Sequence, residues 1–551
     1  TNYNEYVNLC HYDLTGFITK DNLLEVTLAD GWYSGRLGYV KKPEIYGDTN
    51  ALFATLDFEF YDGETRTLQT DGSWKVGKTN ILSSSFFDGE EIDFNYVDQR
   101  KYGELPPAKK LKKEIRFEKY DYEPIKRIDE LYPTIIYQDK NLIRLDFHQN
   151  MVGFVSFTAN GEKGAKVTVK HAEVLNGDGS LYYENLRSVR ATNFAYLSGG
   201  EDLFEPRFTF QGFRYIRLDE YPKMQINLGE ICAIVVHSNM ERTGDFICGN
   251  EKINQLYHNV VWGQKSNYLD VPTDCPQRDE RLGWTGDTQV FCRTGAINYN
   301  VKKFFKKWLG DLALEQREDG AVCGIIPIVR KGKAIGGTRL SAGWGDAACI
   351  CPWEIYLAYG DKKLLKENYP AMRKWVEYVR NVGEEECLWL TGLHYGDWLA
   401  MDAGENEYVG ATSNDLIASA FYAYSTSLLV KAGKVLGYDM SEYETLYNNI
   451  LKRFREYFLP NGYPKDQYPY TEIIPFPHKP VDIFRKGKTQ TALVLILHFN
   501  LCKEEDKPHL TDMLVKLIEE NGMRMTTGFI GTPYILHALS ENGRSDIAYK
   551  L

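Results

Sequence analysis

Apolar and polar positions alternate along much of the first 240 residues, and Gly, Asn and Asp interrupt the alternation at intervals typical of turns. The segment 52–60 alternates in this way, Asp62-Gly63 can supply a tight turn, and 65–67 begins the return. This pattern predicts a β-hairpin.

Further strands are predicted over 167–175 and 207–218, with a turn at 176–179. A run of β elements of this length is most simply divided between two successive β-sandwich domains. We place them at residues 1–125 and 126–243.

After residue 245 the apolar period changes from two to about 3.6, which is typical of helices. Pro370 can open one helix whose apolar face includes Trp375. A second helix is predicted after Ser413, and Ser441 with Glu444 has the spacing of a capping box ahead of a third. A mostly helical domain is therefore expected over 244–551.

The net charge of −11, from 65 basic and 76 acidic residues, would repel a phosphate backbone. The densest basic cluster is short, comprising Lys109, Lys110, Lys112 and Lys113. Runs of about 18 apolar residues are absent, and the N-terminus has no cationic, apolar leader. We expect neither a nucleic-acid nor a membrane partner, and the sequence leaves a homodimer open.

The ten cysteines lack CxxC spacing and are expected to be buried free thiols in a reducing, cytoplasmic compartment. No HExxH motif or paired-His helix occurs, and 176–179 lacks the bidentate Glu of a calcium loop. We therefore predict no cofactor and no metal.

Chemistry-bearing residues concentrate in Asp270–Asp287, which holds five carboxylates, two guanidinium groups and Trp284. Its Pro and Gly residues exclude a continuous helix and predict a constrained loop at the mouth of the helical domain. Solvated ion pairs are the alternative explanation for such a loop. Two further loops, Gly343–Ala347 and Tyr395–Leu399, each combine Trp, Asp and Gly.

Aromatic residues make up 14% of the chain, and their faces stack on the apolar faces of sugar rings. A pocket with aromatic walls and several carboxylates suits a glycosidase, in which two carboxyl groups act across the scissile bond. Each Trp taken alone is more often a core residue than a sugar platform.

The run Asp274–Asp287, with the sequence DCPQRDERLGWTGD, resembles the signature loop of the bacterial α-L-rhamnosidases of glycoside hydrolase family seventy-eight. Shorter segments also resemble this family, at Asp30–Gly35, Ser73–Val76, His171–Leu175, Glu184–Arg187, Glu205–Tyr215 and Thr526–Tyr534. The resemblance implies an (α/α)₆ barrel behind the two β-sandwich domains, and hydrolysis of terminal α-L-rhamnosyl groups with inversion. It leaves calcium in a β domain open, because some family members bind it there.

By motif position the resemblance makes Glu280 the general acid. The sugar-binding residues it implies, together with further acidic neighbours that we include, are Asp274, Arg278, Asp279, Trp284, Asp287, Trp344, Asp346, Asp397 and Trp398. Independently, burial beside Trp284 and like charge from other carboxylates would favour a protonated Glu280. Asp279 is the competing acid.

In the family the general base is a Glu downstream of the Thr-Gly-Phe segment, and this chain stops at Leu551 without it. We expect a fragment whose base lies beyond Leu551, or an unusually short member of the family; replacement of the base by Asp397, Asp402 or Glu405 is improbable. The substrate would be a rhamnose-containing oligosaccharide or glycoside. The alternatives are a non-catalytic carbohydrate-binding protein and a barrel glycosidase acting on another sugar.

Overall fold

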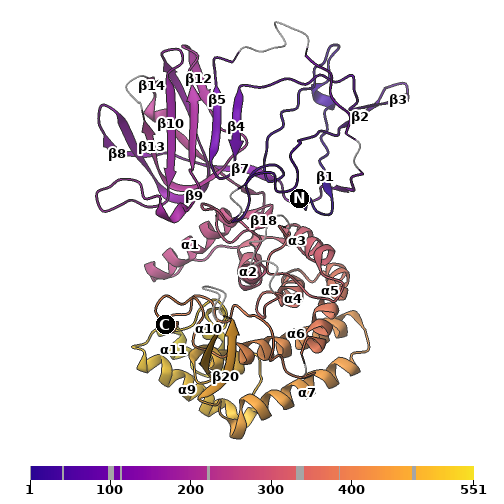
Figure 1. Ribbon diagram of the computed structural model, residues 1–551, viewed down its shortest axis with the longest axis vertical. Helices are drawn as coiled ribbons and strands as arrows, with labels where there is room; N and C mark the ends of the chain where they lie inside the picture. Colours follow the sequence, from indigo (N-terminus) through magenta and orange to yellow (C-terminus); the bar gives the residue numbers. More distant parts are fainter. Residues whose placement is uncertain are drawn as a thin grey trace. The chain divides into compact units, whose positions relative to one another are not determined.

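The computed structural model describes residues 2–39, 42–96, 105–111, 114–219, 224–329, 340–383, 385–473 and 480–551 (Figure 1). Lys112 and Lys113 of the basic cluster lie outside these residues. The chain divides into two compact units. The first contains the residues up to Met240 together with Phe246–Leu282, and the second contains Glu241–Asp245, Gly283–Ile328 and the chain from residue 340.

The first unit is built around a large β-sheet, which has eleven strands in the described part of the chain. Eight of them lie in the order β4 (Ile81–Ser85), β5 (Gly89–Asp93), β11 (Thr192–Tyr196), β10 (Lys166–Ala172), β13 (Gln211–Asp219), β9 (Leu142–Gly161), β15 (Cys232–Ser238) and β7 (Ile125–Leu131). The others, which also pair with β9, are β8 (Thr134–Gln138), β12 (Glu201–Phe204) and β14 (Met224–Ile226).

Strand β9 extends over 20 residues and organises this sheet. Its alternating apolar residues, such as Ile143 and Phe157, are buried in one core. His148 has a φ of 63°, and close to it the register with β13 shifts. A left-handed residue bends a strand, so the first half of β9 pairs with β8 and the second half pairs with β12, β14 and β15.

Smaller elements complete the first unit. Strands β1 (Val7–Leu9) and β6 (Phe117–Lys119) pair in parallel, and helix α1 (Glu251–Asn267) packs on β9 and β15. The predicted hairpin is confirmed as β2 (Thr55–Glu59) and β3 (Thr65–Gln69).

Two other strand predictions can be compared with the structure. The strand predicted at 167–175 is confirmed as β10, and in the following turn the Gly179 N–H donates to the Asn176 carbonyl. Strand β13 begins at Gln211 and not at 207, because the backbone N–H groups of Arg207 and Phe208 donate to the buried Glu90 carboxylate. The proposed domain boundaries at 125 and 243 stay predictions.

The second unit is mainly helical. Its helices are α2 (Thr285–Asn298), α3 (Lys302–Glu315), α4 (Ala347–Tyr359), α5 (Lys362–Asn381), α6 (Asn414–Leu436), α7 (Ser441–Phe458), α8 (Gln490–His498), α9 (Lys507–Glu520), α10 (Thr532–Glu541) and α11 (Ser545–Lys550). Short strands accompany them, with β16 (Glu241–Arg242) paired to β19 (Tyr299–Asn300) and β20 (Gln467–Ile473) to β21 (Pro480–Lys486).

Buried and amphipathic helices alternate in this unit. Helices α4, α6 and α8 are buried around most of their circumference, whereas α5, α7 and α9 bury one stripe. An inner and an outer helix in each hairpin produce this alternation. The fold class predicted from the sequence, β-sandwich domains followed by a helical-hairpin domain, is confirmed.

Two helix-start predictions are wrong. Helix α5 begins at Lys362, where the Asp361 side chain accepts two backbone N–H bonds, and Pro370 lies inside the helix. Both Pro370 and Lys366, whose carbonyl loses its helical partner, are exposed, so water can satisfy that carbonyl. Ser441 forms no capping box, because its hydroxyl donates to the Asp439 carboxylate.

All ten cysteines are free thiols. Six are buried, whereas Cys10 is exposed, so the prediction of buried thiols holds for most of them. Among the described helices, none combines the length and the apolar character needed to cross a membrane.

Candidate active site

The loop Asp274–Leu282 belongs to the first unit. It closes on itself at its base, where the Asp274 N–H donates to the Leu282 carbonyl (3.1 Å) and the Leu282 N–H donates to Asp274 Oδ1 (2.9 Å). The two ends of the loop are therefore held together by one residue pair, and the acidic residues between them project from a defined frame.

Arg281 anchors this loop on the β structure. Its side chain is 1% exposed and donates to the backbone carbonyls of Phe86 (2.7 Å), Phe210 (3.2 Å) and Gln277 (3.3 Å). The guanidinium also lies over the rings of Phe87 and Phe210. Burial lowers the pKa of Arg281 to about 10, so the group stays charged at neutral pH.

Glu280 is 5% exposed, and its carboxylate contacts side chains from three segments of the first unit. The Tyr39 hydroxyl donates to Oε1. Arg187 Nη1 donates to Oε2 at 3.2 Å, and Arg278 Nε lies at 3.2 Å from the same oxygen. The sequence argument considered only carboxylates and Trp284 as neighbours of Glu280, and the structure adds two guanidinium groups and a phenol.

Asp279 is also buried, at 8% exposure, but it has other partners. The Ser188 hydroxyl donates to Asp279 Oδ2 at 2.5 Å, and Arg187 lies 3.8 Å from Oδ1. Ser188 in turn accepts a bond from Arg36 at 2.6 Å. The two adjacent carboxylates therefore occupy different environments, as expected for neighbouring side chains in a loop.

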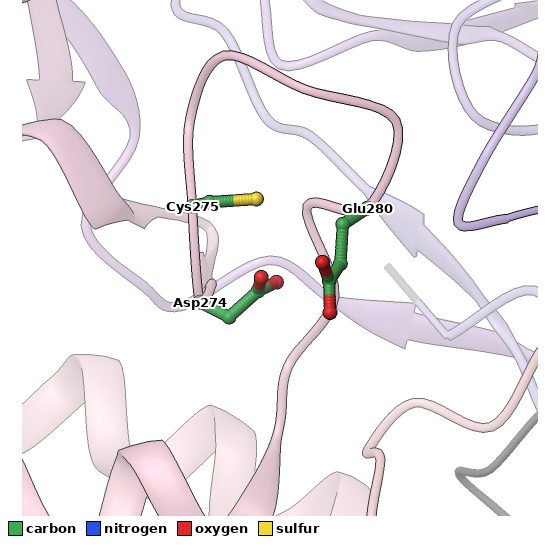
Figure 2. A group of neighbouring side chains, drawn as sticks. All are labelled: Asp274, Cys275 and Glu280. Carbon is green, nitrogen blue, oxygen red and sulfur yellow. The ribbon is translucent and has the colours of Figure 1, made fainter. Parts of the chain in front are cut away.

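Asp274, Cys275 and Glu280 bring their oxygen and sulfur atoms within 4.8 Å of one another (Figure 2). Arg278 lies beside this group, 3.7 Å from Asp274 and 3.2 Å from Glu280. Burial raises the pKa of the Cys275 thiol well above its usual range, which keeps the thiol neutral. The negative charge of the group is thus balanced by guanidinium, and we assign it no metal.

The second unit contains a separate aromatic cluster centred on Tyr395. The Tyr395 ring contacts three Trp rings, with centroid distances of 4.6 Å to Trp344, 5.9 Å to Trp284 and 5.9 Å to Trp398. Phe529 stacks on Trp344 at 5.9 Å. The structure therefore brings together the three Trp residues that the sequence singled out.

Two hydrogen bonds connect the chain just before Gly343 with the chain at His394 and Tyr395, and they hold this cluster together. The Ala342 N–H donates to His394 Nδ1 (3.0 Å), and the Tyr395 N–H donates to the Ser341 hydroxyl (3.0 Å). Because an N–H group can only donate, His394 Nδ1 must be unprotonated, while Nε2–H donates to the Thr391 carbonyl. Burial lowers the pKa of His394 to about 4, in agreement with a neutral ring.

Two of the predicted sugar-binding carboxylates, Asp346 and Asp397, are buried and accept several hydrogen bonds from protein donors. Asp397 is 1% exposed and accepts bonds from the Gly528, Ile530 and Gly531 backbone N–H groups and from the Thr491 hydroxyl. Asp346 is 0% exposed and accepts bonds from the Trp375 indole, the Ser425 hydroxyl and the Gly343 N–H. In both cases burial outweighs these bonds and raises the pKa of the carboxyl. Both side chains hold loops in place.

Asp287 lies half-buried in the first turn of α2, directly after Trp284 and Gly286 in the chain. An added Cβ at Gly286 would lie 2.6 Å from the Trp344 ring, so only glycine allows this ring to approach the helix.

Sequence reasoning missed four residues that the structure places in these groups, namely Tyr39, Arg187, Ser188 and Tyr395. Tyr395 lies beside a Gly-Asp-Trp motif and could have been found there. The other three lie far from the loop in sequence, and only tertiary structure brings them to it.

Comparison with known proteins identifies the family. Residues 241–551 match the family described as bacterial α-L-rhamnosidase 6 hairpin glycosidase domain. Residues 137–237 match the bacterial α-L-rhamnosidase concanavalin-like domain, and residues 1–105 match the α-L-rhamnosidase N-terminal domain.

Relatives agree over the full length of this chain. The α-L-rhamnosidases of Streptomyces avermitilis and Formosa agariphila are 34% and 33% identical to it over 563 and 570 residues. This chain covers 51% and 58% of their lengths. The crystal structure of the Streptomyces avermitilis α-L-rhamnosidase complexed with L-rhamnose matches with a TM-score of 0.86 at 32% identity, over 100% of this chain and 51% of that one.

The chain therefore spans little more than half the length of these relatives. The helical match alone covers more than half of its 551 residues. On this evidence, and as the Asp274–Asp287 loop predicted, the chain belongs to the bacterial α-L-rhamnosidase family.

Proposed function

We propose that this chain contributes the general acid to a glycosidase active site, and that this site removes terminal α-L-rhamnose with inversion of configuration. The observation that carries the proposal is the Glu280 carboxyl, which is almost fully buried in a loop anchored by Arg281, in a chain of the α-L-rhamnosidase family. A general acid needs a fixed position and restricted access to water.

In this proposal Glu280 donates a proton to the departing glycosidic oxygen. Asp274, Arg278, Asp279 and Asp287 bind the sugar hydroxyls. Trp284, Trp344 and Trp398 contact its apolar face. This assignment of roles rests on the sequence resemblance.

Asp346 and Asp397 have another role here. Their oxygens accept bonds from at least three protein donors each, so sugar hydroxyls would have to displace those donors. We assign them to the support of the Trp344 and Trp398 loops.

The reaction needs no cofactor in this proposal, and its partner is a rhamnose-containing oligosaccharide or glycoside. The acidic balance of the chain argues against nucleic acid. Free thiols throughout the chain favour a cytoplasmic location. A homodimer stays a prediction.

The test uses the longest natural form of the protein and a panel of 4-nitrophenyl glycosides. We expect hydrolysis of the α-L-rhamnoside above all others, with β-L-rhamnose as the first product seen by ¹H NMR. The variant E280Q should lose about 10²-fold or more in kcat.

The matched variant D279N changes the neighbouring carboxylate and should affect KM more than E280Q does. If E280Q kept the full rate while D279N lost it, the acid would be Asp279. Binding of rhamnose without hydrolysis of any rhamnoside would favour the carbohydrate-binding alternative.

A further inference from the structure

The contacts of Glu280 point to residues outside the signature loop that act on it. Tyr39 comes from the segment preceding residue 40, and Arg187 follows the short 3₁₀ helix Glu184–Leu186. Both lie more than 90 residues before Glu280 in the sequence. We propose that the Tyr39 hydroxyl and the Arg187 guanidinium are positioning residues that fix the plane of the Glu280 carboxyl and shape the pH profile of the reaction. This inference rests on the proposed function.

The geometry supports a positioning role because the bonds converge on different oxygens. Tyr39 donates to Oε1, whereas Arg187 donates to Oε2 at 3.2 Å. Donors at both oxygens determine the rotation of the carboxyl about its last bond. The Arg187 guanidinium carbon also lies 5.7 Å from the centre of the Tyr39 ring, so the two side chains support each other.

The backbone at Arg187 is strained, with a φ of 56°. A positive φ at a residue other than glycine is unfavourable and persists only where surrounding contacts hold it. The adjacent Ser188 provides such contacts, because its hydroxyl donates to Asp279 and accepts a bond from Arg36. Arg36 in turn donates to both oxygens of Asp88 at 3.0 Å. The strained residue is thus tied to the acidic pair on one side and to the β structure on the other.

The charges around Glu280 determine the direction in which substitutions of its neighbours should move the pH profile. Among the described residues, the titratable and charged groups near Glu280 include Arg187, Arg278, Tyr39, Asp274, Cys275 and Asp279. Burial and the charge of Glu280 raise the pKa of Tyr39, so the phenol stays a donor throughout the working pH range. Arg187 and Arg278 place positive charge beside the Glu280 carboxyl, and Asp274 and Asp279 place negative charge near it.

Arg187 is the more accessible of the two guanidinium groups, with 44% of its side chain exposed against 35% for Arg278. Removing its charge should extend the activity to higher pH, because a positive charge at the acid is lost. Removing the Tyr39 hydroxyl should act in the same direction, because that hydroxyl donates to the carboxylate. Solvent screening weakens the Arg187 effect, because 44% of this side chain is exposed.

The experiment measures kcat/KM against pH for an aryl α-L-rhamnoside, using the longest natural form of the protein. Loss of the acid's proton in the free enzyme produces the alkaline limb of this profile. We expect R187M to move that limb to higher pH, and Y39F to move it in the same direction by less. R187K keeps the charge and should restore the limb to the position of the unchanged protein.

Arg190 is the matched control. It lies three residues beyond Arg187, is 69% exposed and pairs with Asp88, not with Glu280. R190Q should leave the profile unchanged. Thermal unfolding of each variant shows whether it folds, and if R187M does not fold, then R187K and Y39F decide the result.

An alkaline limb that stays in place in both R187M and Y39F, in folded variants, overturns the inference. So does a limb that moves equally in R187K and R187M. Failure of the proposed function has a different signature, because then E280Q would keep its rate or the unchanged protein would not hydrolyse rhamnosides at all.

Discussion

Replacement of Asp397 by Asn separates the predicted role of this residue from the role that the structure gives it. If Asp397 bound sugar, D397N would raise KM and leave the stability of the fold unchanged. The structure instead shows four protein donors on the two carboxylate oxygens. We therefore expect D397N to destabilise the helical unit.

The magnitude follows from these bonds. The Asn side chain keeps one acceptor oxygen, while its NH₂ group faces the donors of the other, so two donors lose their acceptor. Each buried donor left without a partner costs about 1–3 kcal/mol, which gives about 2–6 kcal/mol in total. Relief of the buried charge opposes this loss, so we expect a net loss near the lower limit, about 2 kcal/mol.

The assay is thermal unfolding followed by tryptophan fluorescence, which reports on the Trp344 and Trp398 cluster. With about 2.1 cal/mol/K per residue and roughly 300 residues in the helical unit, a loss of about 2 kcal/mol lowers Tm by about 3 °C. Asp402 provides the matched control, because its side chain accepts a bond from the Ala411 N–H at 3.0 Å. An Asn oxygen can keep that bond, so D402N should leave Tm nearly unchanged. Unchanged Tm in D397N with a raised KM would refute the reasoning.

Three further predictions concern other buried groups. Burial lowers the folded-state pKa of His394 and of His171 to about 4, below the reference value of 6.5. The free energy of unfolding should therefore decrease as pH falls from 6.5 toward 4, by up to about 1.4 kcal/mol for each group and pH unit. Urea titrations across that pH range measure this decrease. R281M should leave three backbone carbonyls without their donor and destabilise the β unit by about 3–5 kcal/mol, visible as a lower urea midpoint. W344A should weaken rhamnose binding, measured by calorimetry, and should also lower Tm, because this ring is 4% exposed and packs on Tyr395 and Phe529. If only the binding or only the Tm changed, Trp344 would have a single role.

The repeating elements of the fold could be predicted from local patterns. The alternation of apolar and polar residues in 52–60 predicted the hairpin, and the change of the apolar period from two to about 3.6 after residue 245 predicted the helical unit. Helix starts were predicted less well, because Pro370 is tolerated where its missing bond faces solvent and Ser441 bonds to Asp439 instead of capping.

The site was predictable only where its residues are close in sequence. Asp274, Glu280 and the Trp loops stand out in the sequence because unusual residue types occur together there. Tyr39 and Arg187 have no local signal, and their roles depend on tertiary contacts. Asp397 shows that a local pattern can also be ambiguous. An Asp beside Gly and Trp looks the same in the sequence whether it binds a ligand or anchors a loop.

The central claim is that the Glu280 carboxyl protonates the departing oxygen of a rhamnoside. The most direct test compares E280Q with the unchanged protein on α-L-rhamnosides whose leaving groups differ in pKa, from 4-nitrophenol to a simple alkyl alcohol. A leaving group that departs readily as an anion needs little protonation, so the rate loss in E280Q should increase steadily with leaving-group pKa. A rate loss of the same size for every leaving group, or no loss at all, would contradict the assignment of Glu280 as the acid.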